Sequence, residues 1–339
     1  YYRKETVDDQ FKEELEKYQP SGFILFRENF TNYENTIQLI ETIENTAKIP
    51  LFITIDQEGG RVQRLKELED SYVTQIPSMT ELGNTNNLTL AYDVGKVIAE
   101  ELQVFGINMD FAPVLDIVDN VQNRVIGDRS FGSNADLVSK MGISLAKGLE
   151  DNGVIAVYKH FPGHGSTILD SHYDLPVIEK TKEELFSSDL VPFKRAIESG
   201  AEVIMIGHLA VPSITKSEIP ASLSKELITG LLKQEMGYNG LIVTDALNMK
   251  ALTNHYSEKD IYELAINAGV DLLLMPSSLE GAVTYIKQSV AEGKITEERI
   301  NESVYKILTL KYKKLSLEKR DRALLGSESH VAIVKRVQP

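Results

Sequence analysis

Residues 136–159 read DLVSKMGISLAKGLEDNGVIAVYK, an amphipathic segment that runs into a short apolar one. In the first part, 136–152, apolar residues recur every three or four positions, which predicts a helix. In the second part, 154–159, β-branched and apolar residues follow one another, which predicts a strand buried on both faces. A helix that leads directly into such a strand is typical of the crossover between parallel strands in an α/β fold.

The same alternation extends over most of the chain. Strand-like runs occur at 23–26, 51–55, 107–111, 154–159, 202–207, 241–245 and 271–275, and helix-like segments at 33–47, 88–105, 136–152, 183–199 and 223–236. This order predicts an α/β fold of the (β/α)8 TIM-barrel type, which needs eight strands where seven are counted. Residues 1–18 are charged and predict a loop and a helix. The barrel is therefore expected to be atypical, or its first strand to precede Tyr1.

The end of the chain has a different character. Residues 296–315 begin with Thr and Glu and continue with apolar positions at helical spacing, which predicts a capped helix. The following stretch is polar. We therefore expect the barrel to end near residue 315 and a stretch of linker character to follow it.

Composition excludes several classes of function. The 339 residues include 36 Lys and Arg against 50 Asp and Glu, a net charge of −14, and no Cys. An acidic surface does not favour nucleic acid, whose binding depends on Lys and Arg. Without Cys there is no disulfide and no thiolate site. No apolar run reaches the length of a membrane span. The compartment stays open.

Polar residues follow several of the predicted strands. Asp56, Asp110, Lys159, His208 and Asp245 each stand at or just after a strand end. In α/β barrels the carboxyl ends of the strands carry the active site, so these residues are candidates for it. Asp245 closes the run LIVTD, where it suits a nucleophile, although an Asp there also caps a following helix.

The densest group of candidates is 159–174, KHFPGHGSTILDSHYD, which holds three of the six histidines: His160, His164 and His172. Pro162 and two glycines predict a loop. Asp170 precedes His172 by two residues, so its carboxylate can orient the imidazole and raise its basicity, as an acid/base catalyst needs. The alternative is that these side chains only stabilise the loop through hydrogen bonds.

Two further segments carry arginines. In 56–64 (DQEGGRVQR), Gly59 and Gly60 let the backbone turn sharply beside Asp56 and Arg64, which suits either an ion pair or a binding site. In 123–131 (NRVIGDRSF), Arg124 and Arg129 offer planar donors for a carboxylate or amide, or simply a solvated loop.

Metal and cofactor chemistry has little support in the sequence. His160 and His164 have the spacing of two ligands on a helix, but Pro162 between them argues against a helix. The chain has no glycine-rich nucleotide motif after a strand and no Gly-x-Ser-x-Gly elbow. We therefore expect neither a metal nor a cofactor.

Taken together, the motifs resemble glycoside hydrolase family 3, in particular its NagZ-type branch of β-N-acetylglucosaminidases. The matching stretches occur in the family's order: 24–29 (ILFREN), 56–61 (DQEGGR), 110–116 (DFAPVLD), 126–131 (IGDRSF), 159–165 (KHFPGHG), 170–172 (DSH) and 243–249 (VTDALNM). The combination of KHFPGHG with DSH is the most specific of them. Residues 326–337 also resemble the family's entry into a second domain. The resemblance therefore implies a catalytic barrel over 1–315 and a linker over 316–339 that leads to a second α/β domain absent from this chain.

The resemblance implies roles for individual residues. Asp245 is expected to be the nucleophile and His172, oriented by Asp170, the acid/base. The residues expected to bind the N-acetylglucosamine unit are Asp56, Arg64, Arg129, Lys159 and His160, with Arg124, His208 and Met249 as further contacts.

The implied activity is an exo-acting, retaining hydrolysis of terminal β-linked N-acetylglucosamine. The expected substrates are peptidoglycan-derived GlcNAc-MurNAc fragments, with chitooligosaccharides also accepted. An exported or cell-envelope location is slightly favoured over a cytoplasmic one.

Two other functions stay open at this stage. An imidazole that has donated its proton is neutral, which favours attack by an anion, so a phosphorylase would use the same pair of residues. A catalytically inactive sugar-binding module is the other alternative, although a binder does not need a nucleophile.

Overall fold

The computed structural model describes residues 6–70, 72–119, 122–167, 171, 173–315 and 319–337. The chain forms two compact units. The first comprises 1–114, 140–157 and 310–339, and the second comprises 115–139 and 158–309. Strand β6 (Ile155–Phe161) is continuous through the boundary, so its first three residues belong to the first unit and its last four to the second.

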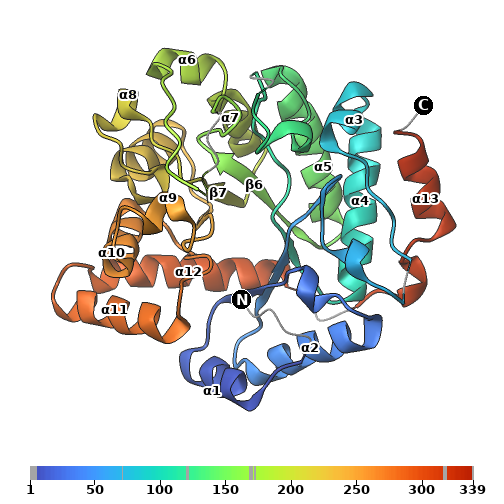
Figure 1. Ribbon diagram of the computed structural model, residues 1–339, viewed down its shortest axis with the longest axis horizontal. Helices are drawn as coiled ribbons and strands as arrows, with labels where there is room; N and C mark the ends of the chain where they lie inside the picture. Colours follow the sequence, from blue (N-terminus) through green and yellow to red (C-terminus); the bar gives the residue numbers. More distant parts are fainter. Residues whose placement is uncertain are drawn as a thin grey trace. The chain divides into compact units, whose positions relative to one another are not determined.

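In the first unit, β1, β2, β5 and the start of β6 form a parallel sheet in that order (Figure 1). Gly22 pairs with Phe52, and Met109 pairs with Thr54 and Ile155. The elements of this unit are α1 (Asp9–Tyr18), β1 (Gly22–Ile24), η1 (Arg27–Asn29), α2 (Tyr33–Thr46), β2 (Phe52–Ile55), β3 (Gln57–Gly59), β4 (Val62–Gln63), η2 (Leu65–Glu67), α3 (Met79–Asn84), α4 (Leu88–Val104), β5 (Met109–Asp110), most of α5 (Ala135–Asp151), η6 (Arg322–Leu324) and α13 (Glu328–Lys335).

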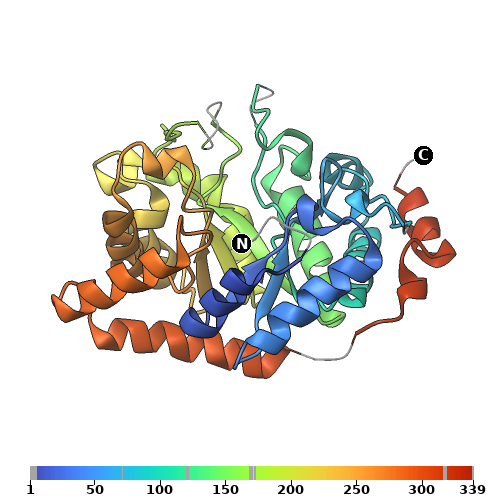
Figure 2. The same cartoon turned by 60° about the horizontal axis from the view of Figure 1, so that its bottom comes forward.

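In the second unit, the end of β6 is followed by β7 and β8, again in parallel (Figure 2). The Gly207 N–H donates to the carbonyl of Phe161 at 2.9 Å, and Val203 pairs with Leu241. The elements of this unit are η3 (Gly127–Arg129), α6 (Lys182–Ser187), α7 (Leu190–Glu198), β7 (Val203–Ile206), α8 (Pro212–Thr215), η4 (Ala221–Leu223), the π-helix η5 (Glu226–Glu235), β8 (Leu241–Thr244), α9 (Lys250–Thr253), α10 (Glu258–Ala268), α11 (Leu279–Ala291) and most of α12 (Glu297–Lys314).

The predicted α/β class is confirmed, since parallel strands alternate with helices along the chain. The helices predicted at 33–47, 88–105, 136–152 and 296–315 are α2, α4, α5 and α12 within a residue or two. The expected cap of α12 is also present, because the Arg299 N–H donates to Thr296 Oγ1 at 3.2 Å.

Three predictions need correction. The helix expected at 183–199 is broken into α6 and α7 at Ser188, whose hydroxyl turns to the fully buried carboxylate of Asp189 at 2.6 Å. The helix at 223–236 is a π-helix, η5, over Glu226–Glu235. The strand at 271–275 is reduced to a single parallel bridge between Leu272 and Val243.

Two glycines set the distance between α4 and α5 in the first unit. A Cβ at Gly95 of α4 would lie 2.1 Å from the carbonyl oxygen of Leu145, and one at Gly148 of α5 would lie 2.1 Å from that of Tyr92. Backbone therefore meets backbone in both directions, a contact that only glycine permits. This close packing holds α5 in place just before the strand β6.

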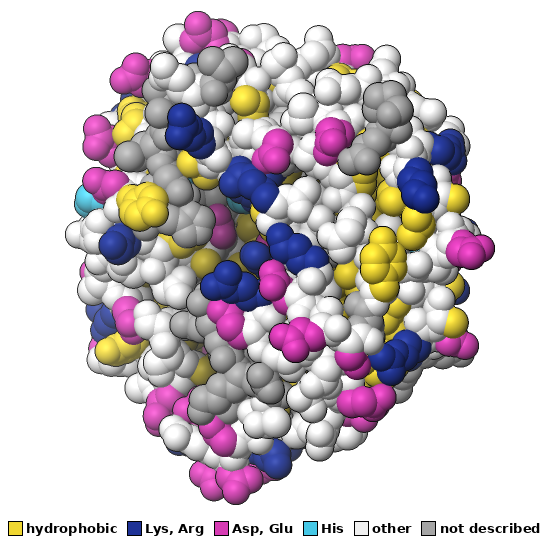
Figure 3. Space-filling model, turned by 45° about the vertical axis from the view of Figure 1, so that its right-hand side comes forward, with side chains coloured by type: hydrophobic (Ala, Val, Ile, Leu, Met, Phe, Trp, Pro, Cys, Tyr) yellow, Lys and Arg dark blue, Asp and Glu magenta, His cyan; other side chains and the backbone are white. Residues whose placement is uncertain are grey.

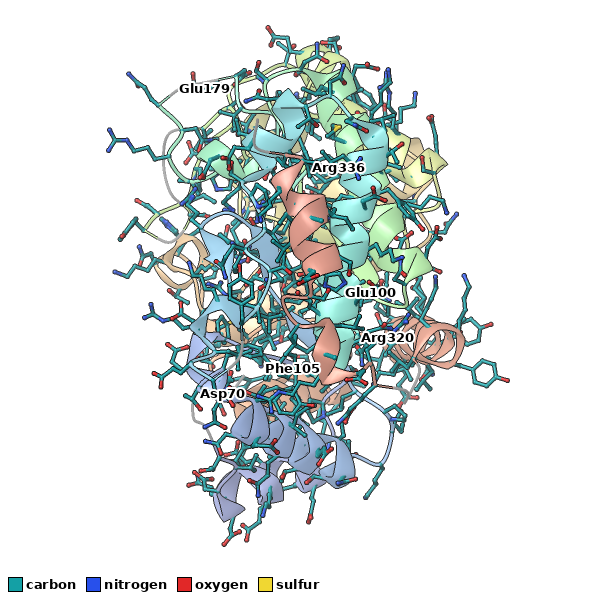
Figure 4. The ribbon with its side chains drawn as sticks, turned by 90° about the vertical axis from the view of Figure 1, so that its right-hand side faces the viewer. Asp70, Glu100, Phe105, Glu179, Arg320 and Arg336 are labelled. Carbon is teal, nitrogen blue, oxygen red and sulfur yellow. The ribbon has the colours of Figure 1, made fainter. Side chains whose placement is uncertain are left out.

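Residues 319–337, which we call the C-terminal strap, pack along α4 in the first unit (Figure 4). The Arg320 N–H donates to the carbonyl of Gln103, and Arg336 pairs with Asp93 at 3.1 Å. In the middle, His330 is buried beside Glu100 and Glu101. The strap lies in the stretch predicted to be a linker, and the division of the chain at residue 315 stays a prediction.

Candidate active site

Asp245 follows the fully buried strand β8 directly. Its N–H donates to the carbonyl of Ile206 on β7 at 2.8 Å, so its backbone is still part of the sheet. Its Oδ1 accepts the N–H of Ala246 at 2.7 Å, while the side chain stays partly exposed. The structure thus holds this carboxylate at the carboxyl end of β8, where the sequence predicted a nucleophile.

The electrostatic surroundings favour the ionised form of Asp245. Burial alone would raise the pKa of this carboxyl, but the charges of His160 and His208, the Ala246 N–H and the Lys159 ammonium outweigh it and lower the pKa. A carboxylate that is charged at neutral pH and fixed in direction suits nucleophilic attack on a carbon centre.

Lys159 and His160 lie on the end of β6, and both are almost fully buried. His160 Nδ1 lies 2.7 Å from Oδ2 of Asp116, whose side chain has no exposed surface. Because a carboxylate only accepts, Nδ1 carries the hydrogen and Nε2 is left on the other side of the ring. Burial would raise the pKa of Asp116, but His160 and His164 lower it.

The loop after β6 is fixed by backbone contacts. Oδ1 of Asp116 accepts the N–H groups of His160 at 3.2 Å and His164 at 2.8 Å. Asn123 Nδ2 donates to the carbonyls of His164 at 2.8 Å and Gly165 at 3.0 Å. A Cβ at Gly165 would lie 1.8 Å from the carbonyl oxygen of Ile117, so the loop passes too close to the chain for any other residue.

His208 is fully buried and touches the turn that follows the candidate nucleophile. Its Nε2 lies 3.0 Å from the carbonyl of Ala246, which can only accept, so Nε2 carries a hydrogen. Its Nδ1 lies 2.8 Å from the hydroxyl of Ser222. His208 therefore holds the residue next to Asp245 in place, in addition to its charge effect on that carboxylate.

Asp56 and Arg64 lie in the first unit and pair with each other. Arg64 Nη2 lies 3.2 Å from Asp56 Oδ2, and the Arg64 N–H donates to Gln57 Oε1 at 2.8 Å. Of the two alternatives left open by the sequence, the ion pair is present, and a binding role for these residues stays a prediction. The Nε of Arg64 is buried and has no hydrogen-bond partner among the described residues.

The remaining candidates lie in the second unit. Arg129, in η3, is half-buried and donates from Nη1 to the carbonyl of Val125 at 3.2 Å, while Arg124 is exposed. Met249 is buried and precedes α9. Asp170 and His172 lie outside the described residues, so their expected pairing stays a prediction.

Asp116, Asn123 and Ser222 are the residues that sequence reasoning gave no role. Asp116 closes the apolar stretch FAPVLD, and a lone carboxylate after such a run indicates a buried acceptor. Asn123 and Ser222 carry no comparable pattern, because their partners are backbone groups and a ring that only folding brings near.

The described part of the chain offers neither a cluster of metal ligands nor a helix that could span a membrane. Its His, Asp and Glu side chains include no group of three or more placed to hold a metal ion. None of its helices combines the length and the apolar character that a bilayer crossing requires. On the face shown in Figure 3, acidic and basic side chains are interspersed.

Comparison with protein families gives one clear result. The model described as the N-terminal domain of glycosyl hydrolase family 3 matches residues 4–310, which is most of the chain.

Individual relatives agree with it. The chain is 33% identical to beta-hexosaminidase A of Pseudoalteromonas piscicida, covering 91% of this chain but only 56% of that protein. It is 36% identical to a beta-hexosaminidase of Haemophilus influenzae, over 82% of this chain and 78% of the relative. A family 3 beta-N-acetylglucosaminidase from Paenibacillus superposes with a TM-score of 0.92 at 36% identity, covering 99% of this chain and 65% of that structure.

Proposed function

The chain belongs to glycoside hydrolase family 3, and from that premise we propose that it is a retaining β-N-acetylglucosaminidase. The observation that carries the proposal is the carboxylate of Asp245. It is held at the end of β8, and His160, His208 and Lys159 lower its pKa. Relatives named as hexosaminidases supply the substrate class.

In the first step, an oxygen of Asp245 forms a bond to the anomeric carbon as the glycosidic C–O bond breaks. His172 gives its proton to the departing oxygen. In the second step, water attacks the same carbon, His172 takes a proton from that water, and the bond to Asp245 breaks. Two displacements at one carbon retain its configuration.

The resemblance assigns the acid role to His172 and its orientation to Asp170, in place of a second catalytic carboxylate. A neighbouring carboxylate stabilises the imidazolium, so the group is protonated near neutral pH. Lys159, His160 and Arg129 are proposed to bind the N-acetylglucosamine unit, while the sugar-binding role expected of Asp56 and Arg64 in the first unit stays a prediction.

For the natural substrate we propose a terminal β-linked N-acetylglucosamine on a peptidoglycan-derived GlcNAc-MurNAc fragment. Chitooligosaccharides offer the same terminal unit. These assignments rest on the family resemblance.

The direct test is an assay with p-nitrophenyl β-N-acetylglucosaminide, with the matching glucoside as control. We expect release of nitrophenol from the first and little from the second. A preference for the glucoside would contradict the substrate assignment. A second arm adds inorganic phosphate, since formation of N-acetylglucosamine 1-phosphate would identify a phosphorylase instead.

A further inference from the structure

Ser222 is a fully buried serine in the short helix η4 of the second unit. Its Oγ lies 2.8 Å from Nδ1 of His208, which is equally buried. A buried hydroxyl that faces a ring nitrogen fixes the rotation of that ring, because turning the ring would separate both polar atoms from their partners. Ser222 therefore sets the direction in which the opposite nitrogen of His208 points.

The backbone around Ser222 is itself fixed to the segment that follows β7. The Ala221 N–H donates to the carbonyl of Leu209 at 2.8 Å, and an antiparallel bridge joins Ala210 to Pro220. The hydroxyl of Ser222 is therefore carried by a backbone that is bonded on both sides to the chain it supports.

The opposite nitrogen of the His208 ring reaches the turn that carries Asp245. Nε2 donates to the carbonyl of Ala246 at 3.0 Å, and the Ala246 N–H donates to Oδ1 of Asp245 at 2.7 Å. The Met249 N–H is a second donor to the same carbonyl, at 3.1 Å, so that oxygen uses both of its lone pairs. Ala246 is thus bonded to His208 on one side and to the candidate nucleophile on the other.

Strand register brings His208 and Ala246 side by side. Ile206 at the end of β7 pairs with Thr244 at the end of β8, and the Asp245 N–H donates to the carbonyl of Ile206 at 2.8 Å. His208 and Ala246 each stand two residues beyond this last pair. The imidazole therefore acts on the turn from the neighbouring strand end, where the sheet holds both segments in place.

We propose that Ser222 is a positioning residue for the nucleophile Asp245. Its hydroxyl fixes the ring of His208, and the ring fixes the residue whose N–H directs the carboxylate. This inference rests on the proposed function, in which an oxygen of Asp245 attacks the anomeric carbon. Small displacements of an attacking group lower the rate strongly. Because Ser222 has no exposed surface, it acts through His208 and not on the sugar.

Ser224 offers a matched control two positions further along the chain. It is also fully buried, but its Oγ accepts the N–H of Leu227 at 3.2 Å and donates to Glu226 at 3.0 Å, at the start of η5. Replacing either serine by alanine removes one buried hydroxyl. Only Ser222→Ala removes the contact to His208.

The experiment measures kcat/KM and the melting temperature of Ser222→Ala and Ser224→Ala. The first substrate is 2,4-dinitrophenyl β-N-acetylglucosaminide, whose leaving group departs without a proton, so kcat/KM reports the attack of Asp245 and not the action of the acid. We expect kcat/KM to fall about tenfold for Ser222→Ala and to stay within about twofold for Ser224→Ala. The fall should be of similar size on N,N′-diacetylchitobiose, because the same carboxylate attacks both substrates. Both variants should lose a comparable amount of thermal stability.

A second arm tests the path through His208. His208→Gln keeps a side-chain donor but loses the ring nitrogen that faces Ser222. In that background, Ser222→Ala should change kcat/KM by less than about twofold, because its partner is already gone. A full further loss would show that Ser222 acts by another route and would overturn the inference.

Equal falls in kcat/KM for the two alanine variants, or no fall for Ser222→Ala, would also overturn it while leaving the proposed function intact. If the unmodified chain cleaves neither glycoside, the proposed function fails first and this inference with it. If Ser222→Ala does not fold, Ser222→Cys keeps a side-chain atom at this position and weakens the hydrogen bond, with Ser224→Cys as its control. We then expect the same contrast in smaller size, and its absence would contradict the proposal.

Discussion

Each unit has a buried histidine that pairs with a buried carboxylate, and the two pairs have different effects on their surroundings. In the second unit, His160 pairs with Asp116 at 2.7 Å on the strand end that also carries Lys159. In the first unit, His330 of the C-terminal strap lies 2.9 Å from Glu100 and 3.2 Å from Glu101 (Figure 4). In both places an imidazole nitrogen lies within hydrogen-bond distance of a carboxylate oxygen.

The two histidine–carboxylate pairs differ in their surroundings. Around His330, Glu101 also accepts from the hydroxyl of Thr74 at 2.6 Å and from the Gly326 N–H at 2.9 Å. These bonds join three segments of the first unit. His160 instead acts on the pKa of a partly exposed carboxylate, Asp245. The two pairs therefore differ in what they affect: the His160 pair acts on the candidate nucleophile, and the His330 pair joins segments of the first unit.

The largest expected effect is at Asp245. Asp245→Asn removes the nucleophile with little change of shape, so we expect kcat/KM on the nitrophenyl substrate to fall by roughly 10⁴-fold or more. The melting temperature serves as the control for folding. A variant with close to normal turnover would remove Asp245 from the mechanism.

The next effect is at His172. For His172→Ala we expect a loss of about 10²-fold to 10³-fold on chitobiose and a much smaller one on a dinitrophenyl glycoside. Steady-state kinetics on both substrates measure this. Losses of the same size on the two would argue that His172 binds the sugar and does not transfer the proton.

Asp116→Asn tests the His160–Asp116 pair of the candidate active site. It removes the charge that orients His160 and keeps the side-chain volume, so we expect kcat/KM to fall by about tenfold to 100-fold. Stability should also fall, by about 1–3 kcal/mol, because two backbone N–H groups lose a charged acceptor. Urea unfolding and the nitrophenyl assay separate the two effects. A loss of stability with an unchanged rate would place Asp116 in the same class as Glu101.

His330→Gln tests the histidine pair of the C-terminal strap. Here we expect stability to fall and activity to stay nearly unchanged. The free energy of unfolding should fall by about 1–3 kcal/mol while kcat/KM stays within about twofold. Burial alone would lower the pKa of His330, but the hydrogen bonds of Glu101 and Glu100 outweigh it and raise the pKa. The stabilisation is therefore fully present below the unfolded value of about 6.5 and is lost as pH rises through the higher folded value.

Urea unfolding at about pH 6 and about pH 9 measures this, with the variant as the control for other titrating groups. The unmodified chain should lose more stability over that interval than the variant does. Identical slopes, or a large loss of activity in the variant, would break the distinction between the two pairs.

Much of this architecture could be predicted from the sequence, because each strand and helix carries its own periodicity. The predicted strands at 51–55, 202–207 and 241–245 are β2, β7 and β8. The break at Ser188 could not be predicted, since it depends on where the Asp189 carboxylate is buried after folding. The pairing of His330 with Glu100 and Glu101 depends on contacts about 230 positions apart, which no local pattern reports.

The same limit applies to the site. The strand-end positions of Asp245, Lys159 and His160 could be predicted, because each polar residue closes an apolar run, while the roles that the resemblance implies for them stay predictions. The supporting contacts of Asn123 and Ser222 could not, because backbone carbonyls and buried rings have no sequence signature.

The central claim is that Asp245 becomes covalently bonded to the sugar. The direct measurement is mass spectrometry of peptides from the chain after reaction with a fluorinated N-acetylglucosaminyl fluoride that slows the second step. The account predicts one added sugar on the peptide that contains Asp245, and none in Asp245→Asn. A sugar on another carboxylate, or rapid turnover with inverted configuration and no adduct, would contradict it.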